Sequence, residues 1–177
     1  MSADKTSPAS PKRRWLLKAS LGVAAAAGLL GGGIWWRRGI DGTTLTADGA
    51  MVFRALARGI VGPMLPAAQA DRDRLLDHYV TEVQKLVAAL PEAKRQQIAL
   101  LTGLLANTPT RYMVASLGRS WDEASDDDIR AALEHLRSAP LITHRMAFVA
   151  CRAITCLAFF SIPDNQTLTA YPGPLPL

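Results

Sequence analysis

The chain has 177 residues and a formal net charge of +5, from 20 basic and 15 acidic side chains. A basic chain can indicate nucleic-acid binding, but here the excess charge lies at one end, because residues 1–44 hold 7 basic and 2 acidic side chains. The remaining residues carry 13 of each sign and are neutral. The charge distribution therefore excludes nucleic acid as a partner and sets the first 44 residues apart from the rest.

A basic stretch followed by a mild apolar run opens the chain. It reads Lys12-Arg13-Arg14-Trp15-Leu16-Leu17-Lys18, and the next 18 residues, Ala19 to Trp36, are uncharged and rich in Ala and Gly. A lipid-spanning helix needs about 20 strongly apolar residues, whereas an export signal has a basic start and a shorter, milder core. The stretch resembles the twin-arginine signal, Ser/Thr-Arg-Arg-x-Phe-Leu-Lys, with Leu16 in place of Phe and Lys12 in place of Ser or Thr. We therefore predict export by the twin-arginine translocase; the alternative is a chance arginine pair before a membrane anchor.

The end of the apolar run leaves removal of the leader open. No Ala-x-Ala cleavage site follows it; Trp35 and Trp36 end the run, and Arg37 and Arg38 come directly after. Tryptophans at the membrane interface and arginines at its aqueous edge are also typical of an uncleaved anchor. The prediction is a periplasmic protein, membrane-tethered if the leader stays attached.

Three segments follow from the pattern: a signal, anchor or linker segment over residues 1–44, a helical domain over residues 45–162, and a Pro-rich tail over residues 163–177. The domain is long enough to bury a core. Helices are expected after Thr46, over residues 71–90, from Pro91 to about residue 107, over residues 108–118, after Ser125, and from about Pro140 to Ser161. The prediction is an all-α fold, a single bundle of five or six helices after an N-terminal signal helix, with an extended tail.

The clearest helical pattern is the apolar stripe over residues 71–90. Its members recur at steps of three and four along the chain and so share one helix face. They are Leu75, Leu76, Tyr79, Val80, Val83, Leu86, Val87 and Leu90.

A search for chemistry predicts no catalytic, cofactor-binding or metal-binding residue. His78, His135 and His144 are far apart in sequence and lack the spacing of zinc ligands, so each is interpreted as a surface or packing residue. The acidic run that ends in three aspartates after Ser125 lacks the Gly and terminal Glu of a calcium loop. It is expected to be a solvated helix start, where acidic side chains favour the helix dipole.

The last predicted helix is apolar all round, since Arg152 is the only charge between Met146 and Ile162. Such a helix is either the centre of a bundle or covered by a partner. A membrane span is the less favoured alternative, because an arginine near mid-length costs about 2.5–3.5 kcal/mol on insertion scales. The proline-rich tail that follows favours an extended backbone, and Tyr171 would give it an aromatic anchor on another protein.

The leader, the opening after Leu45 and above all the ending resemble one family. It comprises the small, gamma-type, twin-arginine subunits of membrane-associated FAD-dependent sugar and polyol dehydrogenases, such as those for gluconate, sorbitol, fructose and glucose. Its members show a Leu-rich helix, an Arg before an apolar helix, an aromatic pair, a Pro, and Gly-Tyr-Pro-Gly-Pro. The corresponding residues here are Leu133, Leu136, Arg145, Phe159, Phe160, Pro163, Tyr171, Pro172, Gly173 and Pro174, with Ala170 where Gly is usual.

The resemblance implies an accessory subunit, not an enzyme. It would bind a large flavoprotein that carries the FAD and lacks its own signal, and would escort that folded cargo through the twin-arginine route. The resemblance also allows a cytochrome c subunit in the complex. The partner contacts it implies are Phe159, Phe160, Tyr171, Pro172, Gly173 and Pro174. Two alternatives stay open: a stand-alone periplasmic or membrane-tethered helical protein with a structural role, and a small enzyme with an unrecognised site.

The two cysteines, Cys151 and Cys156, are predicted not to pair with each other. Five residues of helix separate them by about 7.5 Å of rise and about 140° of rotation, and bridged cysteines need Cα atoms within about 7 Å. Two buried thiols are one interpretation. The resemblance implies the other, a disulfide to the large subunit, for which Cys151 is narrowly preferred because it lies beside Arg152.

Overall fold

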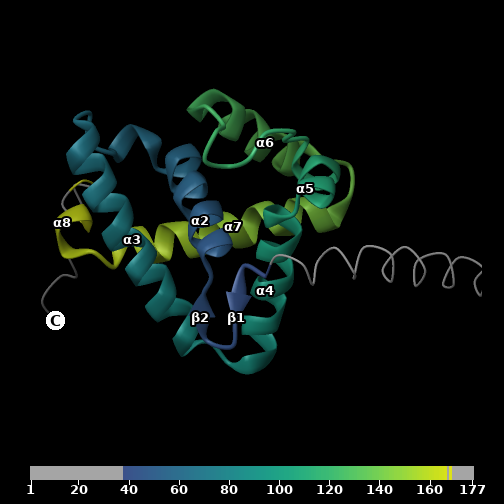
Figure 1. The fold of residues 1–177 in the computed structure, drawn as a ribbon, viewed down its shortest axis with the longest axis horizontal. Coiled ribbons are helices and arrows are strands. Elements are labelled where there is room, and N and C mark those ends of the chain that lie inside the picture. Colours follow the sequence, from purple (N-terminus) through teal and green to yellow (C-terminus); the bar gives the residue numbers. More distant parts are fainter. Residues whose placement is uncertain (1–37, 167, 169–177) are drawn as a thin grey trace, which may run out of the picture.

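The computed structural model describes residues 38–166 and residue 168, and within them the chain is mostly helical, as predicted (Figure 1). The predicted signal helix and most of the tail lie outside these residues. The elements in chain order are β1 (Ile40–Asp41), β2 (Thr44–Leu45), α2 (Ala47–Ile60), the 3-10 turn η1 (Gly62–Met64), α3 (Gln69–Ala89), α4 (Glu92–Ala106), α5 (Thr108–Ala115), α6 (Asp126–Ser138), α7 (Ile142–Phe160) and α8 (Pro163–Gln166).

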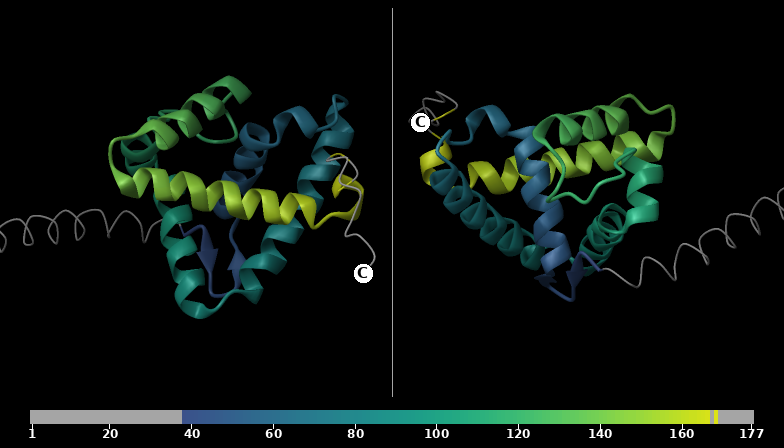
Figure 2. Two further views of the ribbon diagram at one scale, coloured as in Figure 1. Left: turned by 180° about the vertical axis from the view of Figure 1, so that it is seen from behind. Right: turned by 45° about the horizontal axis from the view of Figure 1, so that its top comes forward.

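Helix α2 forms the centre of the bundle and packs against α3, α4, α6 and α7. Helices α3 and α4 diverge from a short connection, and the antiparallel β1–β2 hairpin lies between them (Figure 1). Helix α7 crosses the back of α2 and packs against α3 and α6. Seen from behind, it lies in front of the other helices (Figure 2, left). One side of α7 therefore faces the core and the other faces away from the described chain.

The start of α2 confirms the predicted cap. The Thr46 hydroxyl accepts a hydrogen bond from the Gly49 amide at 3.1 Å and donates one to the Arg38 carbonyl. A side chain at Gly49 would overlap the Gly39 carbonyl oxygen, so glycine is needed for this close approach. Ile40 is buried. The end of the segment predicted as leader and linker thus contacts the helical domain at Gly39 and Ile40, while residues 41–44 are exposed.

The predicted stripe on α3 is confirmed. Leu76, Tyr79, Val83 and Val87 are buried, and the other stripe residues are at least partly buried. The middle of the chain differs in detail from the prediction. Pro91 caps α4 rather than opening it, and α5 begins at Thr108 as predicted but ends at Ala115 rather than near residue 118.

The start of α6 also confirms its prediction. Ser125 and Asp128 form a capping box, in which the Asp128 amide donates to Ser125 Oγ and the Ser125 amide donates to Asp128 Oδ2, both at 3.1 Å. The loop before it contains a residue whose role the sequence did not reveal. Trp121 is fully buried, and its indole N–H donates to the Leu105 carbonyl at 2.7 Å. This bond ties the loop to the end of α4.

The tail does not begin as an extended strand. Residues Pro163–Gln166 form the short helix α8, and the buried Asn165 side-chain amide donates to the Phe159 carbonyl at 2.9 Å. The expectation of an extended backbone from residue 163 is therefore wrong for these four residues, because Asn165 supplies a partner for the end of α7. Tyr171, Pro172, Gly173 and Pro174 lie outside the described residues.

Candidate functional site

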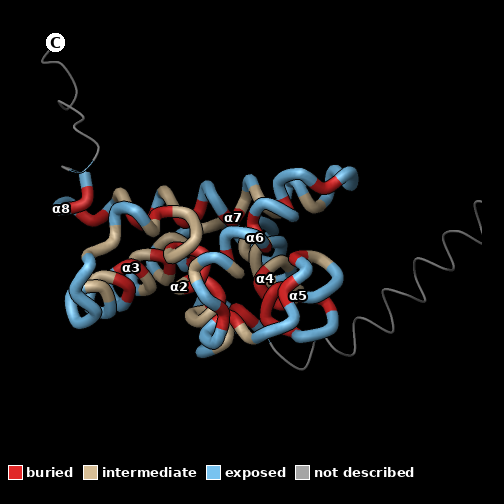
Figure 3. Tube along the Cα trace, turned by 90° about the horizontal axis from the view of Figure 1, so that it is seen from above, coloured by how far each residue is buried: buried red, intermediate tan, exposed pale blue. Residues whose placement is uncertain are grey.

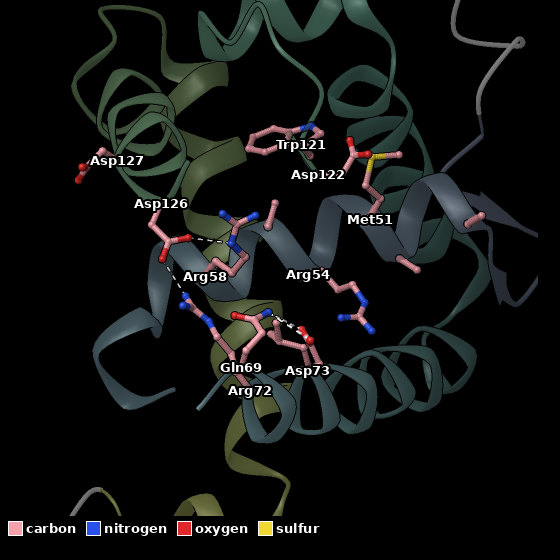
Figure 4. A pocket seen from close by; sticks show the side chains of 14 residues that line it. Met51, Arg54, Arg58, Gln69, Arg72, Asp73, Trp121, Asp122, Asp126 and Asp127 are labelled. Atoms are coloured by element: carbon pink, nitrogen blue, oxygen red, sulfur yellow. Dashed lines mark hydrogen bonds and ion pairs between the residues drawn. The ribbon is translucent and has the colours of Figure 1, made fainter. Parts of the chain in front are cut away.

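A pocket of about 790 Å³ lies between α2, α3 and the start of α6 (Figure 4). Its apolar wall includes Met51, Leu76 and Trp121, and charged side chains surround them. Arg58 from α2 and Arg72 from α3 converge on Asp126 at the start of α6, with N···O distances of 2.7 and 2.8 Å. The pocket is thus a junction at which one carboxylate joins three helices.

The central charges of this pocket, Arg58, Arg72 and Asp126, are paired with one another. Burial acts to raise the pKa of Asp126, but the hydrogen bonds from Arg72 and Arg58 outweigh it and hold the pKa below its usual range. Arg58 also donates to the Ala124 carbonyl at 2.8 Å, and Arg54 pairs with Asp77. A carboxylate held ionised between two guanidinium groups is a poor general base. The arrangement is that of a structural ion-pair network.

The described residues contain no group of three or more His, Cys, Asp or Glu side chains that could hold a metal ion. Two histidines that are distant in sequence lie near each other in the fold: the ring centroids of His135 on α6 and His144 on α7 are 6.5 Å apart. His78 lies instead on α3, where its Nε2 is 3.7 Å from Glu82. Neither arrangement supplies a nucleophile with an adjacent base.

The outward face of α7 is the more unusual surface. Four large apolar side chains on it are 60–65% exposed, although the opposite face is buried against α2, α3 and α6. The four are Ile142, Met146, Val149 and Leu157. Figure 3 shows this alternation of buried and exposed positions along the helix. Exposed apolar side chains are ordinary when scattered, whereas a contiguous stripe marks a surface that something covers.

Helix α7 is also the one element among residues 38–166 that is long and apolar enough to span a membrane, with a mean hydropathy of 1.3 over its most apolar window. Of the 18 residues in that most apolar stretch, 28% are buried. Its buried face includes Ile154, Thr155 and Phe159, which pack on the other helices. A helix that forms part of a soluble core meets the same criteria, so length and hydropathy by themselves do not distinguish the two roles.

The aromatic pair implied as a partner contact is divided between the core and the surface. Phe159 is fully buried and its ring packs edge-to-face against Phe160, with centroids 5.2 Å apart. Phe159 is therefore a core residue of this chain, and its burial disfavours the direct partner contact predicted for it. Phe160 is partly exposed and remains available.

The two cysteines also differ in how far they are buried. Both are free thiols, as the helical spacing predicted, but Cys151 is buried and Cys156 is partly exposed. Burial also raises the pKa of Cys151 to about 12, which suppresses the thiolate that disulfide exchange requires. In the described fold Cys156 is therefore the more accessible thiol, and burial disfavours Cys151, the residue preferred from the sequence.

Sequence reasoning missed the outward stripe, although the signal for it was present. The apolar positions of α7 predict a helix that is either at the centre of the bundle or covered by a partner, but hydropathy alone does not say which face packs. No protein-family model, no curated protein and no solved structure matches the chain. The function must therefore be argued from the residues themselves.

Proposed function

We propose that this chain is a non-catalytic small subunit that binds a large FAD-dependent sugar or polyol dehydrogenase and escorts it through the twin-arginine route to the periplasm. The observation that carries the proposal is the outward face of α7, where apolar side chains that are 60–65% exposed lie in a stripe. A stripe of this kind is expected to be covered by a partner. The leader around Arg13 and Arg14 indicates where that complex is sent.

Export of a folded complex explains why such a leader stands before such a domain. The twin-arginine route carries folded cargo, and a helical domain for which the sequence predicts no cofactor site has little need of it for itself. A flavoprotein that must take up FAD before export does need it. In this proposal the FAD, the active site and the substrate specificity all belong to the large subunit, and a cytochrome c subunit is one candidate for the electron acceptor.

Cys156 gives the proposed complex a covalent fastening. Its thiol lies on the partly exposed side of α7, next to the exposed Leu157. A disulfide between Cys156 and a cysteine of the large subunit forms from two thiols, and the two protons and two electrons pass to a periplasmic thiol–disulfide oxidant. The bridge would therefore form after export.

A stand-alone membrane-tethered protein is the second candidate. Trp35 and Trp36 after the leader, together with the hydropathy of α7, favour it. In that case the apolar face of α7 would rest on lipid and no flavoprotein would be bound.

Purification of the tagged full-length chain from its native cells separates the two candidates. We expect a large protein to co-purify in stoichiometric amount, with the visible absorbance of bound flavin. A non-reducing gel should show a heavy band that separates on reduction and is lost with Cys156→Ser but kept with Cys151→Ser. Recovery of the chain alone, without flavin, would overturn the proposal.

A further inference from the structure

Six side chains on the outward face of α7 follow a seven-residue repeat, with alternating steps of four and three along the chain. They are Ile142, Met146, Val149, Ala153, Cys156 and Phe160, and we call them the α7 seam. Alternating steps of this kind keep an apolar seam in register with a facing helix. The first four are exposed and the last two are partly exposed. The seam therefore has the spacing of a helix–helix interface but no facing helix among the described residues.

Two arginines border the seam on one side. Arg145 and Arg152 are exposed, lie seven residues apart, and occupy the position that flanks a seam in such a repeat. Neither makes a hydrogen bond or an ion pair with any described residue. Every other arginine among residues 38–166 makes at least one. The two guanidinium groups left unpaired thus lie together along the edge of the uncovered seam.

We propose, as an extension of the partner role argued above, that the α7 seam receives an amphipathic helix of the large subunit. The apolar side of that helix packs on the seam, and carboxylates spaced seven residues apart along its edge pair with Arg145 and Arg152. Guanidinium groups form directed, charge-assisted hydrogen bonds with carboxylates, so the arginines set both the orientation and the register of the docked helix.

A second copy of the chain does not fit this surface. Residues 142–160 contain no Asp or Glu, so a second α7 brings no carboxylate to the arginines. An antiparallel pairing of the two copies would place arginine edge against arginine edge, which is repulsive.

A lipid surface fits less well than a helix. Lipid accepts any apolar face whatever its register, whereas here both the apolar residues and the arginines recur every seven positions. In addition, the arginines lie on one edge only, since Thr143, Ala150 and Leu157 occupy the other. Positive charge on one edge of the seam is suited to a facing helix that carries carboxylates along one of its edges.

Peptide titration of the full-length chain tests the seam directly. The acidic probe has three heptads, with Leu at both seam positions and Glu at both flanking positions, and its basic twin carries Lys in place of Glu. We expect the acidic peptide to bind at least about tenfold more tightly than the basic one. The double variant Arg145→Glu/Arg152→Glu should reverse this preference, because two exposed charge pairs turn from attractive to repulsive. Equal binding of the two peptides, or an unchanged preference in the double variant, would overturn the proposal.

A matched pair of methionine variants provides the control for the apolar contact. Met146 lies in the seam and is 65% exposed, while Met113 lies on α5 and is 62% exposed. Met146→Asp should abolish binding of the acidic peptide and Met113→Asp should leave it unchanged. Because both side chains are exposed, both variants should keep the thermal midpoint of the parent. Equal loss of binding in the two variants would show that the seam is not the docking surface.

The same variants in the purification from native cells distinguish this proposal from the subunit role. If the parent and all variants capture the flavoprotein equally, the subunit role stands, but the α7 seam is not the surface that binds the large subunit. If the parent captures no flavoprotein, the subunit role fails, and the peptide titration then decides whether the α7 seam binds an acidic amphipathic helix. Vesicles of phosphatidylglycerol provide the lipid test: vesicle binding that is lost in the double variant, with no binding of the acidic peptide, would assign the seam to a membrane instead.

Discussion

Replacement of Tyr79 by Phe tests the buried contact that joins α3 to the inner side of α7. The Tyr79 phenol donates to the Thr155 hydroxyl at 3.2 Å, and both residues are fully buried. Burial raises the pKa of Tyr79 far above its ordinary value, so the hydroxyl is a neutral donor at every physiological pH. The pair is therefore a neutral hydrogen bond that is shielded from water.

The expected loss follows from that shielding. Tyr79→Phe leaves the Thr155 hydroxyl without its donor, and Thr155→Val leaves the Tyr79 phenol without its acceptor. Each single change should lower the free energy of unfolding by about 1–3 kcal/mol, because a buried polar group loses its partner. The double variant removes both polar groups. Its loss in free energy of unfolding should be smaller than the sum of the two single losses, and no larger than about one of them.

Urea unfolding of the full-length chain, followed by circular dichroism, measures this cycle. A coupling free energy of about 1 kcal/mol or more between the two changes is expected for residues in direct contact. Flavoprotein capture should be unaffected, since neither side chain lies on the outward face of α7. Strictly additive losses would refute the reasoning, because they would show that the two hydroxyls do not depend on each other.

Three further changes have defined outcomes. Lysine at both Arg13 and Arg14 keeps the charge but removes the planar guanidinium groups, so the chain and any flavoprotein partner should stay in the cytoplasm. Unchanged periplasmic yield in fractionated cells would contradict the twin-arginine prediction. Cys151→Ala should flatten the alkaline loss of stability. Burial raises the pKa of Cys151 in the folded state to about 12, so the neutral thiol contributes its full share of the free energy of unfolding below the unfolded pKa near 9. That contribution is lost as the pH rises toward 12, at up to about 1.4 kcal/mol per pH unit. Parallel pH profiles of the free energy of unfolding in parent and variant would contradict this. Gly49→Ala should destabilise the fold by about 2 kcal/mol or more despite its better helix propensity, because the new side chain meets the backbone before β1. Gly62→Ala, which meets no atom within 4 Å, is its control in thermal unfolding.

The features that the sequence predicted well depend on residues a few positions apart. Thr46 and Ser125 begin α2 and α6 as expected, because a cap is a contact between a side chain and an amide three positions later. The buried stripe of α3 could likewise be predicted from its spacing, since 3.6 residues per turn fixes which side chains share a face. The details that differed include the end of α5, which lies three residues before the predicted one, and the short helix α8.

The candidate surface could be predicted only in part. The sequence alone determined that the last long helix is apolar and that Cys151 and Cys156 cannot bridge within it. It also predicts an export signal around Arg13 and Arg14, which lie outside the described residues. It could not determine which side of α7 the other helices cover, because apolar residues surround the whole helix and any face would have packed. That choice is made by contacts distant in sequence, such as the bond from Tyr79 on α3, which turn one face inward. The tertiary structure therefore decided that Cys151 and Phe159 are core residues, and that the seam with its two unpaired arginines faces outward.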